Sequence, residues 1–450
     1  MTAPSFSTFC APLLTKLTSK VALKNTPILL QRLLKHGKMQ LFAASESKNE
    51  YKKLRNEITS GEKQGHLNST VINETLRDTV AETAKNETCA TLIHDPSELR
   101  KQYSKELENI GKVRDLGKNV INGYDSFNTV ATFGNSKQVH LMQNEVYSNR
   151  QPNFLKAEDI ENLKKGKDFP GQDAAKALYE SDDYINRKRV SQDNMRSAST
   201  ALKSVNPSIK VEHILDREYD DEEQFDFIED ELGDKFIIRL KASRILQNLD
   251  ESKPYEKLTE YDFENSDTYV LQNISLHNKA YQDVKLTINY EKVGNRTVVK
   301  IEMKDRNGNA IFKQPMLLIT NHPIHNIEQA REIYLSYLKR WRIESVFKFV
   351  KSALGWEEFR LKDFNGIKTL IAIGFFIASY LYKIGERELD EDLSGFLSQI
   401  GGGKGVVSRH FIWEGIRNLL IKYKVDEVFR ERKPTQETVT NLKNIVGMNF

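Results

Sequence analysis

The chain has 450 residues, of which 39% are hydrophobic and 29% are charged. This length predicts two to four domains with a sizeable core under a highly charged surface. The 67 basic and 63 acidic residues give a net charge of only +4, a balance that neither requires nor excludes nucleic acid as a partner.

Cysteine content and apolar segments exclude several other classes of protein. Two cysteines, Cys10 and Cys89, cannot form a disulfide framework or a four-ligand zinc site, which favours a reducing cytoplasm. Lys16 and Lys20 interrupt the apolar residues near the N-terminus, so no signal peptide is predicted. The apolar run 369–382 is shorter than the roughly 20 residues of a membrane span and is predicted to be a core helix. We therefore expect a cytoplasmic location and no membrane partner.

Residues 1–88 lack a strand pattern and are predicted to form a helical domain. One helix is signalled by Thr26-Pro27 at its first turn and by Gly37 just past its end. Basic residues recur through the region: Lys16, Lys20, Lys24, Arg32, Lys35, Lys38, Lys52, Lys53 and Arg55. This bias favours a domain that binds DNA ends, although an ordinary helical subdomain with solvated lysines has the same composition.

A first candidate acid follows a short apolar run that begins at Cys89. The sequence Ala-Thr-Leu-Ile-His-Asp95-Pro-Ser predicts a strand that presents Asp95 at its tip. Further strands are predicted at 127–133 and 139–147. Asp125, which lies just before the second strand, is the alternative first acid.

A second candidate acid follows the polar, mostly helical region 150–210. That region contains four cations available for phosphates: Arg187, Lys188, Arg189 and Arg196. Residues 211–215 predict a short apolar strand that ends in Asp216. Asp216 also suits the N-cap of a following helix, and capping could coexist with metal binding. The acidic run 220–231 is predicted to be that helix.

Between residues 233 and 315 the pattern changes to strands joined by tight turns. Strands are predicted from residue 235 and at 269–276, 284–290 and 297–304, with hairpin turns at Gly294-Asn295 and Asn307-Gly308. A run of hairpins inside an α/β pattern predicts an insertion domain. Arg239 and Arg244 are candidate DNA contacts, and ordinary exposed strand charges are the alternative.

The most informative stretch is residues 337–351, which contain no Gly or Pro and are predicted to form a helix. At about 100° per residue, one face of this helix carries the following polar side chains within roughly 60°: Tyr337, Arg340, Glu344 and Lys351. A carboxylate flanked by cations suits a metal-assisted phosphodiester site, because the acid holds metal and the bases hold phosphates. The spacing also fits a surface helix in which Arg340 and Glu344 form an ordinary ion pair.

These four positions form the pattern Y-x2-R-x3-E-x6-K, which resembles the signature of bacterial insertion-sequence transposases of the DDE type, in particular the insertion-sequence-four family. The intervening Trp-Arg-Ile is also typical. The resemblance covers roughly residues 89–385. It implies an α/β fold with an RNase H-like catalytic core interrupted by a β-rich insertion, between helical N- and C-terminal regions. The expected domains are the end-binding domain 1–88, the core 89–232 and 316–385, the insertion 233–315, and a possible dimerisation region 386–450.

The resemblance implies that three acids carry the chemistry: Asp95, Asp216 and Glu344. They would be catalytic and would bind two Mg²⁺ ions, with Mn²⁺ expected to substitute. Asp95-Pro-Ser stands where the family has Asp-x-Thr, and Asp95 is favoured over Asp125 because the spacer 110–116 normally follows the first acid. Converging carboxylates repel one another without cations. Two ions about 3.5–4 Å apart activate the attacking oxygen and stabilise the leaving one.

The implied function is metal-dependent cleavage and strand transfer of insertion-sequence ends. Tyr337, Arg340 and Lys351 would hold the phosphates near the metals, while Arg239 and Arg244 stay candidate DNA contacts in the insertion. Water would nick the end, and the freed 3′-hydroxyl would attack, in some relatives through a hairpin.

The implied partners are double-stranded DNA, as terminal inverted repeats and target, and a second copy of the chain in the DNA complex. The implied location is a bacterial cytoplasm, in association with the nucleoid. Two alternatives remain at this point: an inactive transposase-derived DNA-binding protein, and an RNase H-like nuclease that needs no specific terminal sequence.

Overall fold

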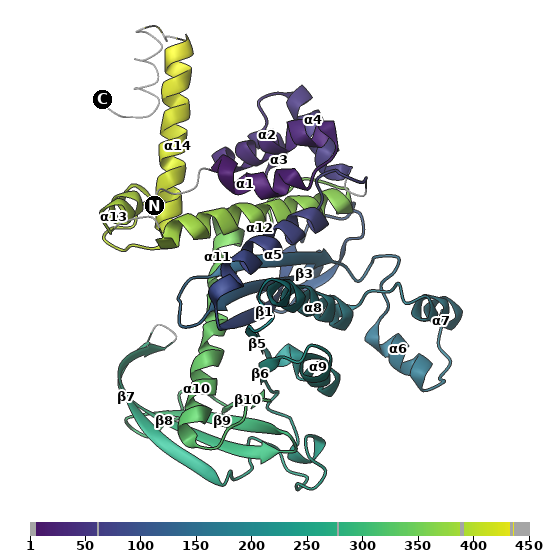
Figure 1. Ribbon diagram of the computed structural model, residues 1–450, viewed down its shortest axis with the longest axis vertical. Helices are drawn as coiled ribbons and strands as arrows, with labels where there is room; N and C mark the ends of the chain where they lie inside the picture. Colours follow the sequence, from purple (N-terminus) through teal and green to yellow (C-terminus); the bar gives the residue numbers. More distant parts are fainter. Residues whose placement is uncertain (1–5, 61–62, 277–278, 388–390, 433–434, 436–450) are drawn as a thin grey trace.

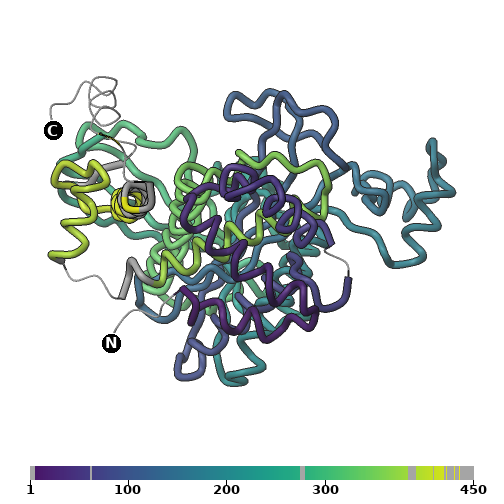
Figure 2. Tube along the Cα trace, turned by 90° about the horizontal axis from the view of Figure 1, so that it is seen from above, coloured from purple at the N-terminus to yellow at the C-terminus, as the bar shows by residue number. Residues whose placement is uncertain are grey.

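The computed structural model describes residues 6–60, 63–276, 279–387, 391–432 and 435. Figure 1 shows one long twisted sheet with helices packed around one half and a smaller, mostly β part at the other end. Helices α6 and α7 project on the side opposite α13 and α14 (Figures 1 and 2). The mixed α/β class predicted from the sequence is confirmed.

The N-terminal region is helical, as predicted. Its elements are α1 (Phe6–Thr15), α2 (Lys20–His36), α3 (Leu41–Ala44), α4 (Lys48–Thr59), α5 (Ser69–Thr83) and the 3-10 turn η1 (Ala84–Asn86). The predicted start of α2 is wrong: Ser19 caps the helix by accepting from the Ala22 amide, so Pro27 lies inside it. Its predicted end is right, because Gly37 has φ +77° and its amide binds the Leu33 carbonyl.

Ten strands form one sheet in the order β2-β3-β1-β5-β6-β10-β9-β8-β7, with β4 paired to β3. They are β1 (Cys89–Arg100), β2 (Gly111–Arg114), β3 (Val120–Phe133), β4 (His140–Tyr147), β5 (Lys210–Leu215), β6 (Lys235–Arg239), β7 (Asn265–Leu276), β8 (Lys279–Val293), β9 (Arg296–Asp305) and β10 (Met316–Thr320). Strands β1, β5 and β6 are parallel, and the other pairs are antiparallel.

Strand β1 corrects one prediction, because Asp95 lies inside the strand and not at its tip. The parallel pairing with β5 ends at Ile93↔Ile214, whereas the pairing with β3 continues to Arg100. Beyond Ile93 the strand therefore has a neighbour on one side only. Pro96, which lacks an N–H group, is tolerated in a strand with such an open edge.

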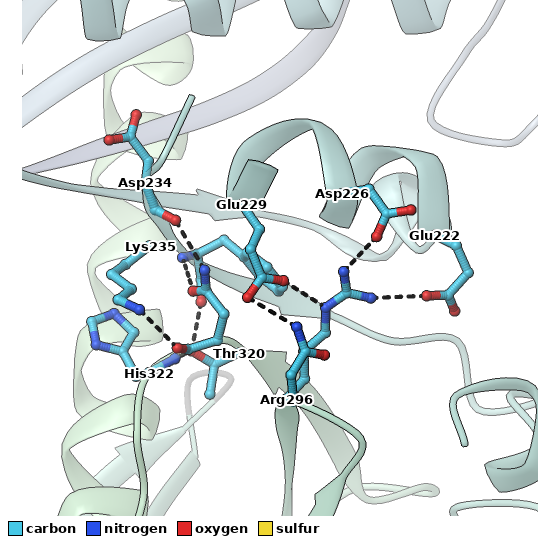
Figure 3. A network of polar contacts seen from close by, with 11 residues as sticks. Glu222, Asp226, Glu229, Asp234, Lys235, Arg296, Thr320 and His322 are labelled. Carbon is cyan, nitrogen blue, oxygen red and sulfur yellow. Dashed lines mark hydrogen bonds and ion pairs between the residues drawn. The ribbon is translucent and has the colours of Figure 1, made fainter. Parts of the chain in front are cut away.

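The segment 233–315, predicted to be an insertion, extends the same sheet. Strand β6 pairs with β5 and β10, and β9, β8 and β7 follow outward from β10. Arg296, at the start of β9, forms ion pairs with the acidic helical segment that follows β5 and so connects strand β9 to it (Figure 3). The domain boundaries themselves stay a prediction.

The remaining helices lie in two groups. Between β4 and β7 are α6 (Ala157–Lys164), α7 (Gln172–Glu180), α8 (Arg187–Val205), the 3-10 turn η2 (Arg217–Tyr219), α9 (Glu222–Asp226), the π-helical turn η3 (Phe227–Glu231) and η4 (Leu246–Asn248). After β10 are α10 (Ile327–Tyr337), the 3-10 turn η5 (Leu338–Arg340), α11 (Trp341–Ser352), α12 (Phe364–Arg387), α13 (Glu391–Ile400) and α14 (Arg409–Arg432). The prediction of one continuous α-helix over 337–351 is therefore wrong, because the 3-10 turn η5 interrupts it. In the predicted C-terminal region, residues 388–390, 433–434 and 436–450 lie outside the described residues.

Helix α12 runs through the core and joins the N-terminal helices to the sheet. The rings of Phe9 and Phe376 lie 4.8 Å apart, and the buried Trp356 donates to the Ile371 carbonyl at 2.9 Å. Among the described residues, the segment Phe364–Lys383 alone is long and apolar enough to cross a membrane, and 72% of it is buried. The apolar run predicted at 369–382 is shorter than this observed apolar segment. The burial of the segment is typical of a core helix.

Candidate active site

The three predicted acids come from three elements that meet at one end of the parallel strands. Asp95 lies on β1, Asp216 directly follows β5, and Glu344 lies in the first turn of α11. Asp95 and Asp216 each lie two residues beyond the last parallel pair, Ile93↔Ile214. Because side chains alternate along a strand, this register places both carboxylates on the same face of neighbouring strands.

The guanidinium of Arg340 joins two of these carboxylates. Its Nη2 atom donates to Oε1 of Glu344 at 2.5 Å, and its Nη1 atom lies 3.6 Å from Oδ1 of Asp95. The Arg340 side chain is only 9% exposed, whereas Glu344 is 40% exposed. The predicted ion pair between Arg340 and Glu344 therefore forms, but it lies against a buried acid and not on an open surface.

Asp216 is held by a second set of contacts. Its Oδ1 atom accepts from the Arg217 amide at 2.7 Å, so it caps η2 as the sequence allowed. Tyr337 donates its hydroxyl to the same oxygen at 3.5 Å, and Nη1 of Arg239 lies 4.0 Å away. The structure thus brings Asp216, Tyr337 and Arg239 together beside the Arg340 group.

A partly buried polar network that the sequence did not signal connects α10 to the sheet. Glu212 on β5 accepts from the Ser336 hydroxyl at 2.7 Å and lies 3.0 Å from Nε2 of His322. Burial alone would raise the pKa of Glu212, but the contacts with His322 and Ser336 outweigh it and lower that pKa. The residues lie too far apart in the sequence for a local pattern to reveal them. They connect β5 to α10, the helix that ends at Tyr337.

Asp95 is electrostatically strained. Burial, together with the nearby Asp216, Glu344 and Glu98, raises its pKa to about 7, although Arg340 opposes the shift. In addition, Nε of Arg340 is buried without a hydrogen-bond partner. The charge of one guanidinium therefore does not offset the negative charge of the acids around it. Residues with perturbed pKa values are concentrated at functional sites.

The donor set fits a hard divalent cation in its chemistry. Carboxylate oxygens are the ligands that Mg²⁺ and Mn²⁺ prefer, and a cation would favour the charged form of Asp95. Among the described residues, no three His, Cys, Asp or Glu side chains lie closely enough to form a complete metal site. In this conformation the guanidinium of Arg340 contacts two of the three acids.

Two predicted DNA contacts lie outside this group. Lys351 donates to the Glu98 carbonyl at 2.8 Å and lies 3.6 Å from the carboxylate of Glu357. Arg244 forms ion pairs with Asp220 and Glu222, and its side chain is only 16% exposed. Arg244 is therefore not the exposed strand charge that the alternative expected.

The alternative first acid, Asp125, faces different neighbours. It pairs with Glu98 across β1 and β3. Its pKa is raised to about 6 by burial, with Arg187 opposing the shift and Glu98 adding to it. The geometry groups Asp95, and not Asp125, with Asp216 and Glu344. The catalytic role of Asp95 stays a prediction.

Residues 196–381 match a family model described as the transposase DDE domain. The matched segment runs from within α8 into α12 and contains Asp216 and the whole stretch 337–351, whereas Asp95 lies before it. The match supports a DDE transposase, an enzyme class that cleaves DNA, transfers strands and typically uses divalent metal ions.

Proposed function

We propose that the protein is a transposase of the insertion-sequence-four family, which moves an insertion sequence by metal-dependent cut-and-paste chemistry. The observation that carries the proposal is the convergence of Asp95, Asp216 and Glu344 around Arg340, in a chain whose residues 196–381 match the transposase DDE domain. Strands β4, β3, β1, β5 and β6 would form the RNase H-like core that presents these acids.

The proposed roles follow from the contacts of each side chain. Asp95, Asp216 and Glu344 would hold two Mg²⁺ or Mn²⁺ ions, which when bound activate the attacking oxygen and stabilise the leaving one. Arg340 now directs its two terminal nitrogens to Asp95 and Glu344, and we expect it to bind a phosphate with them once metal ions engage those acids. The Tyr337 hydroxyl, next to Asp216, would orient the same phosphate.

Two steps of the proposed reaction act on the transferred strand, and the opposite strand must also be cut at each end before the element is released. Water attacks a phosphodiester at each end of the element, and the broken phosphorus–oxygen bond leaves a free 3′-hydroxyl. That hydroxyl then attacks a phosphodiester of the target strand, joins the element to it and releases the target's own 3′-oxygen. Both steps need a positioned phosphate. The positions of Tyr337 and Arg239 beside Asp216, next to Arg340, support their proposed role in holding it.

The other parts of the chain would serve DNA binding and assembly. The basic helical region 1–88 and the β-rich segment 233–315 would hold the terminal inverted repeats. The C-terminal helices α13 and α14 would support a homodimer in the DNA complex. Lys351, whose amino group contacts the carbonyl of Glu98, would contribute its charge near β1.

The test is excision in cells of a marker flanked by the element's own ends. We expect excision with the wild type, none with Asp216→Ala or Asp95→Ala, and near-normal excision with Asp125→Ala as the matched control. Excision that needs Asp125 but not Asp95 would contradict the assignment of the first acid. Wild-type protein that binds the ends in a gel shift without excision would indicate an inactive DNA-binding protein.

A second measurement separates the transposase from a nuclease. Purified protein is given paired element ends, a target plasmid and Mg²⁺, and the products are separated on a gel. Joined products that require the terminal sequence support the proposal. Hydrolysed ends that form from any sequence, without joined products, would contradict it.

A further inference from the structure

Three buried polar side chains form a hydrogen-bonded chain across the parallel strands. Nε2 of His94 on β1 lies 2.9 Å from Nδ1 of His213 on β5, and Nε2 of His213 lies 3.0 Å from Oδ2 of Asp234, which directly precedes β6. None of the three is more than 3% exposed. Because side chains alternate along a strand, His94 points to the face of the sheet opposite Asp95. The strand register places the ring of His213 on the same face as that of His94.

The carboxylate of Asp234 fixes the direction of the hydrogen bonds. An ionised carboxylate only accepts, so Nε2 of His213 donates to it, and Nδ1 of His213 accepts from Nε2 of His94. On α8, the Ser199 hydroxyl donates to Asp234 at 2.5 Å, and the Lys203 amino group lies 2.5 Å from it. Because Lys203 already offsets the charge of Asp234, a second buried positive charge on His213 would be uncompensated. His213 is therefore neutral, and both rings carry a proton on Nε2.

The chain is complete at its other end. The Thr129 hydroxyl on β3 donates to Nδ1 of His94 at 2.9 Å, so both nitrogens of each histidine ring have a partner. A fully satisfied buried network favours one geometry, because leaving any member unpaired costs free energy. The chain therefore links β3, β1, β5 and α8 to the residue that begins β6.

The contact between the two histidines lies where the backbone pairing of β1 with β5 ends. His94 is the first residue of β1 beyond the last pair, and His213 immediately precedes that pair on β5. Asp95 and Asp216 follow on the opposite face, where the two strands have no backbone pairing with each other. Two neighbouring carboxylates repel each other until a cation binds. The hydrogen bond between the histidines is thus placed to resist separation of the two strand ends.

We propose that the hydrogen bond between His94 and His213 holds the ends of β1 and β5 at the separation at which Asp95 and Asp216 can share a divalent cation. The two histidines are positioning residues, since their side chains lie on the face away from the acids. The inference rests on the proposed function for the cation, whereas the restraint on the strand ends acts without it.

Binding of Mn²⁺ to the purified protein without DNA, measured by titration calorimetry, tests the positioning role. His213→Leu keeps a buried side chain but removes the hydrogen bond, and we expect it to bind Mn²⁺ about tenfold more weakly, as is usual for residues that orient metal ligands. His213→Asn keeps an acceptor near the position of Nδ1 and should bind within about threefold of the wild type. Asp216→Ala shows which part of the binding belongs to the site. Equal losses in the Leu and Asn variants would overturn the role of this hydrogen bond.

A double variant separates positioning from stability. In His213→Leu the ring of His94 loses its partner, so the melting temperature should fall. His94→Leu/His213→Leu replaces both polar groups by apolar ones and should melt at least as high as the single variant. We expect its Mn²⁺ affinity to stay about tenfold below that of the wild type. An affinity that recovers together with the melting temperature would show a purely structural role and overturn the inference.

The matched control for stability is Arg296→Met, which removes a cation that connects β9 to α9 and η3. It lowers stability in a part of the sheet that does not include the histidine chain. We expect it to bind Mn²⁺ like the wild type. An equal loss of Mn²⁺ affinity in Arg296→Met and His213→Leu would show that any destabilisation of the sheet disturbs the site, and would overturn a specific role for the histidines.

Hydrogen exchange measured by mass spectrometry tests the restraint without metal. We expect His213→Leu to speed exchange about tenfold at the ends of β1 and β5, and Arg296→Met to speed it mainly in α9 and η3. Unchanged exchange at the two strand ends in His213→Leu overturns the inference, whatever the metal result. If the wild type and Asp216→Ala bind Mn²⁺ alike, the proposed metal site fails and exchange alone decides the inference. If Asp216→Ala loses Mn²⁺ but His213→Leu binds it normally, the inference fails and the proposed function stands.

Discussion

Two buried arginines are each surrounded by acids, and they are satisfied to different degrees. Arg296 uses all three of its side-chain nitrogens: Nη1 binds Glu222 at 3.0 Å, Nη2 binds Asp226 at 2.5 Å, and Nε binds Glu229 at 3.0 Å (Figure 3). Arg340 binds Glu344 at 2.5 Å but only approaches Asp95, at 3.6 Å. Its Nε atom has no partner.

The difference separates a structural clamp from a site with unused binding capacity. Arg296 ties β9 to α9 and η3, so its network is complete when the chain is folded. The Arg340 group retains a strained acid, Asp95, and an unpaired donor. Such deficits are expected at functional or strained sites, and within this chain the buried Nε atoms of Arg100 and Arg244 also lack partners, so the strained acid is what sets the Arg340 group apart. We therefore expect the loss of the arginine charge to lower the stability of the Arg296 group more than that of the Arg340 group.

The largest expected effect is that of Glu344→Ala on catalysis. If Glu344 holds metal as proposed, its loss should lower the rate of strand cleavage by about a thousandfold or more, because metal ions supply several kcal/mol of transition-state stabilisation. End binding should remain nearly intact, since no cation is removed. Cleavage of a labelled end fragment and a gel shift measure the two effects. Glu229→Ala, which removes one acid from the Arg296 group, is the matched control and should cleave normally. Cleavage by Glu344→Ala at the normal rate would refute the site assignment.

Arg296→Met should have the largest effect on stability. It leaves three acids near one another without their shared cation, which we expect to lower the free energy of unfolding by about 2–3 kcal/mol after allowance for their partial exposure. Arg340→Met should cost less, because Asp95, with a pKa already raised to about 7 by burial, can take up a proton when its counterion is lost. Urea unfolding of both variants at neutral pH measures the difference. A larger loss for Arg340→Met would reverse the comparison.

The variant Asp95→Asn should reveal the raised pKa of Asp95 through the pH dependence of the free energy of unfolding. The pKa of Asp95 is raised from 3.8 to about 7 in the folded protein, so between these values the folded state holds a proton that the unfolded state has released. Wild-type stability therefore falls as pH rises toward 7. Without divalent ions, Asp95→Asn should gain on the order of 2–3 kcal/mol relative to the wild type between pH 5 and pH 8. A pH-independent difference would show that Asp95 is not strained.

Local signals in the sequence predicted those elements whose boundaries depend on local chemistry. Gly37 ends α2, and Gly294 and Gly308 turn their hairpins with positive φ. The strand before Asp216, with Val211, Ile214 and Leu215 as its apolar residues, is followed by an acid that caps the next turn. In each case one residue type satisfies a backbone requirement within a few positions, so the pattern is visible in the sequence.

Features that depend on distant partners could not be predicted. Asp95-Pro96 looks like the end of a strand, but pairing with β3 carries β1 on to Arg100. The stretch 337–351 has the periodicity of a helix, yet its start winds into a 3-10 turn at 338–340. Spacing did identify the face that carries Tyr337, Arg340 and Glu344, since a break of one short turn keeps it largely intact. The network of Glu212, His322 and Ser336 has no counterpart in any local pattern.

The smallest expected effects come from Arg239 and Arg244. Like Arg340 and Arg296, these two arginines differ in how many acids bind them. Arg239 lies 4.0 Å from Asp216 with its side chain 33% exposed, whereas Arg244 is bound by Asp220 and Glu222. Arg239→Ala should weaken DNA binding about fivefold, with the salt slope reduced by about 1, and leave stability within about 0.5 kcal/mol. Arg244→Ala should leave DNA affinity unchanged and lower the free energy of unfolding by about 1 kcal/mol. Anisotropy with an element end and urea unfolding measure both quantities. If Arg244→Ala weakened binding as much as Arg239→Ala, an arginine whose charge is already matched by two acids would still bind phosphate, and charge balance would no longer distinguish a structural arginine from a DNA-binding one.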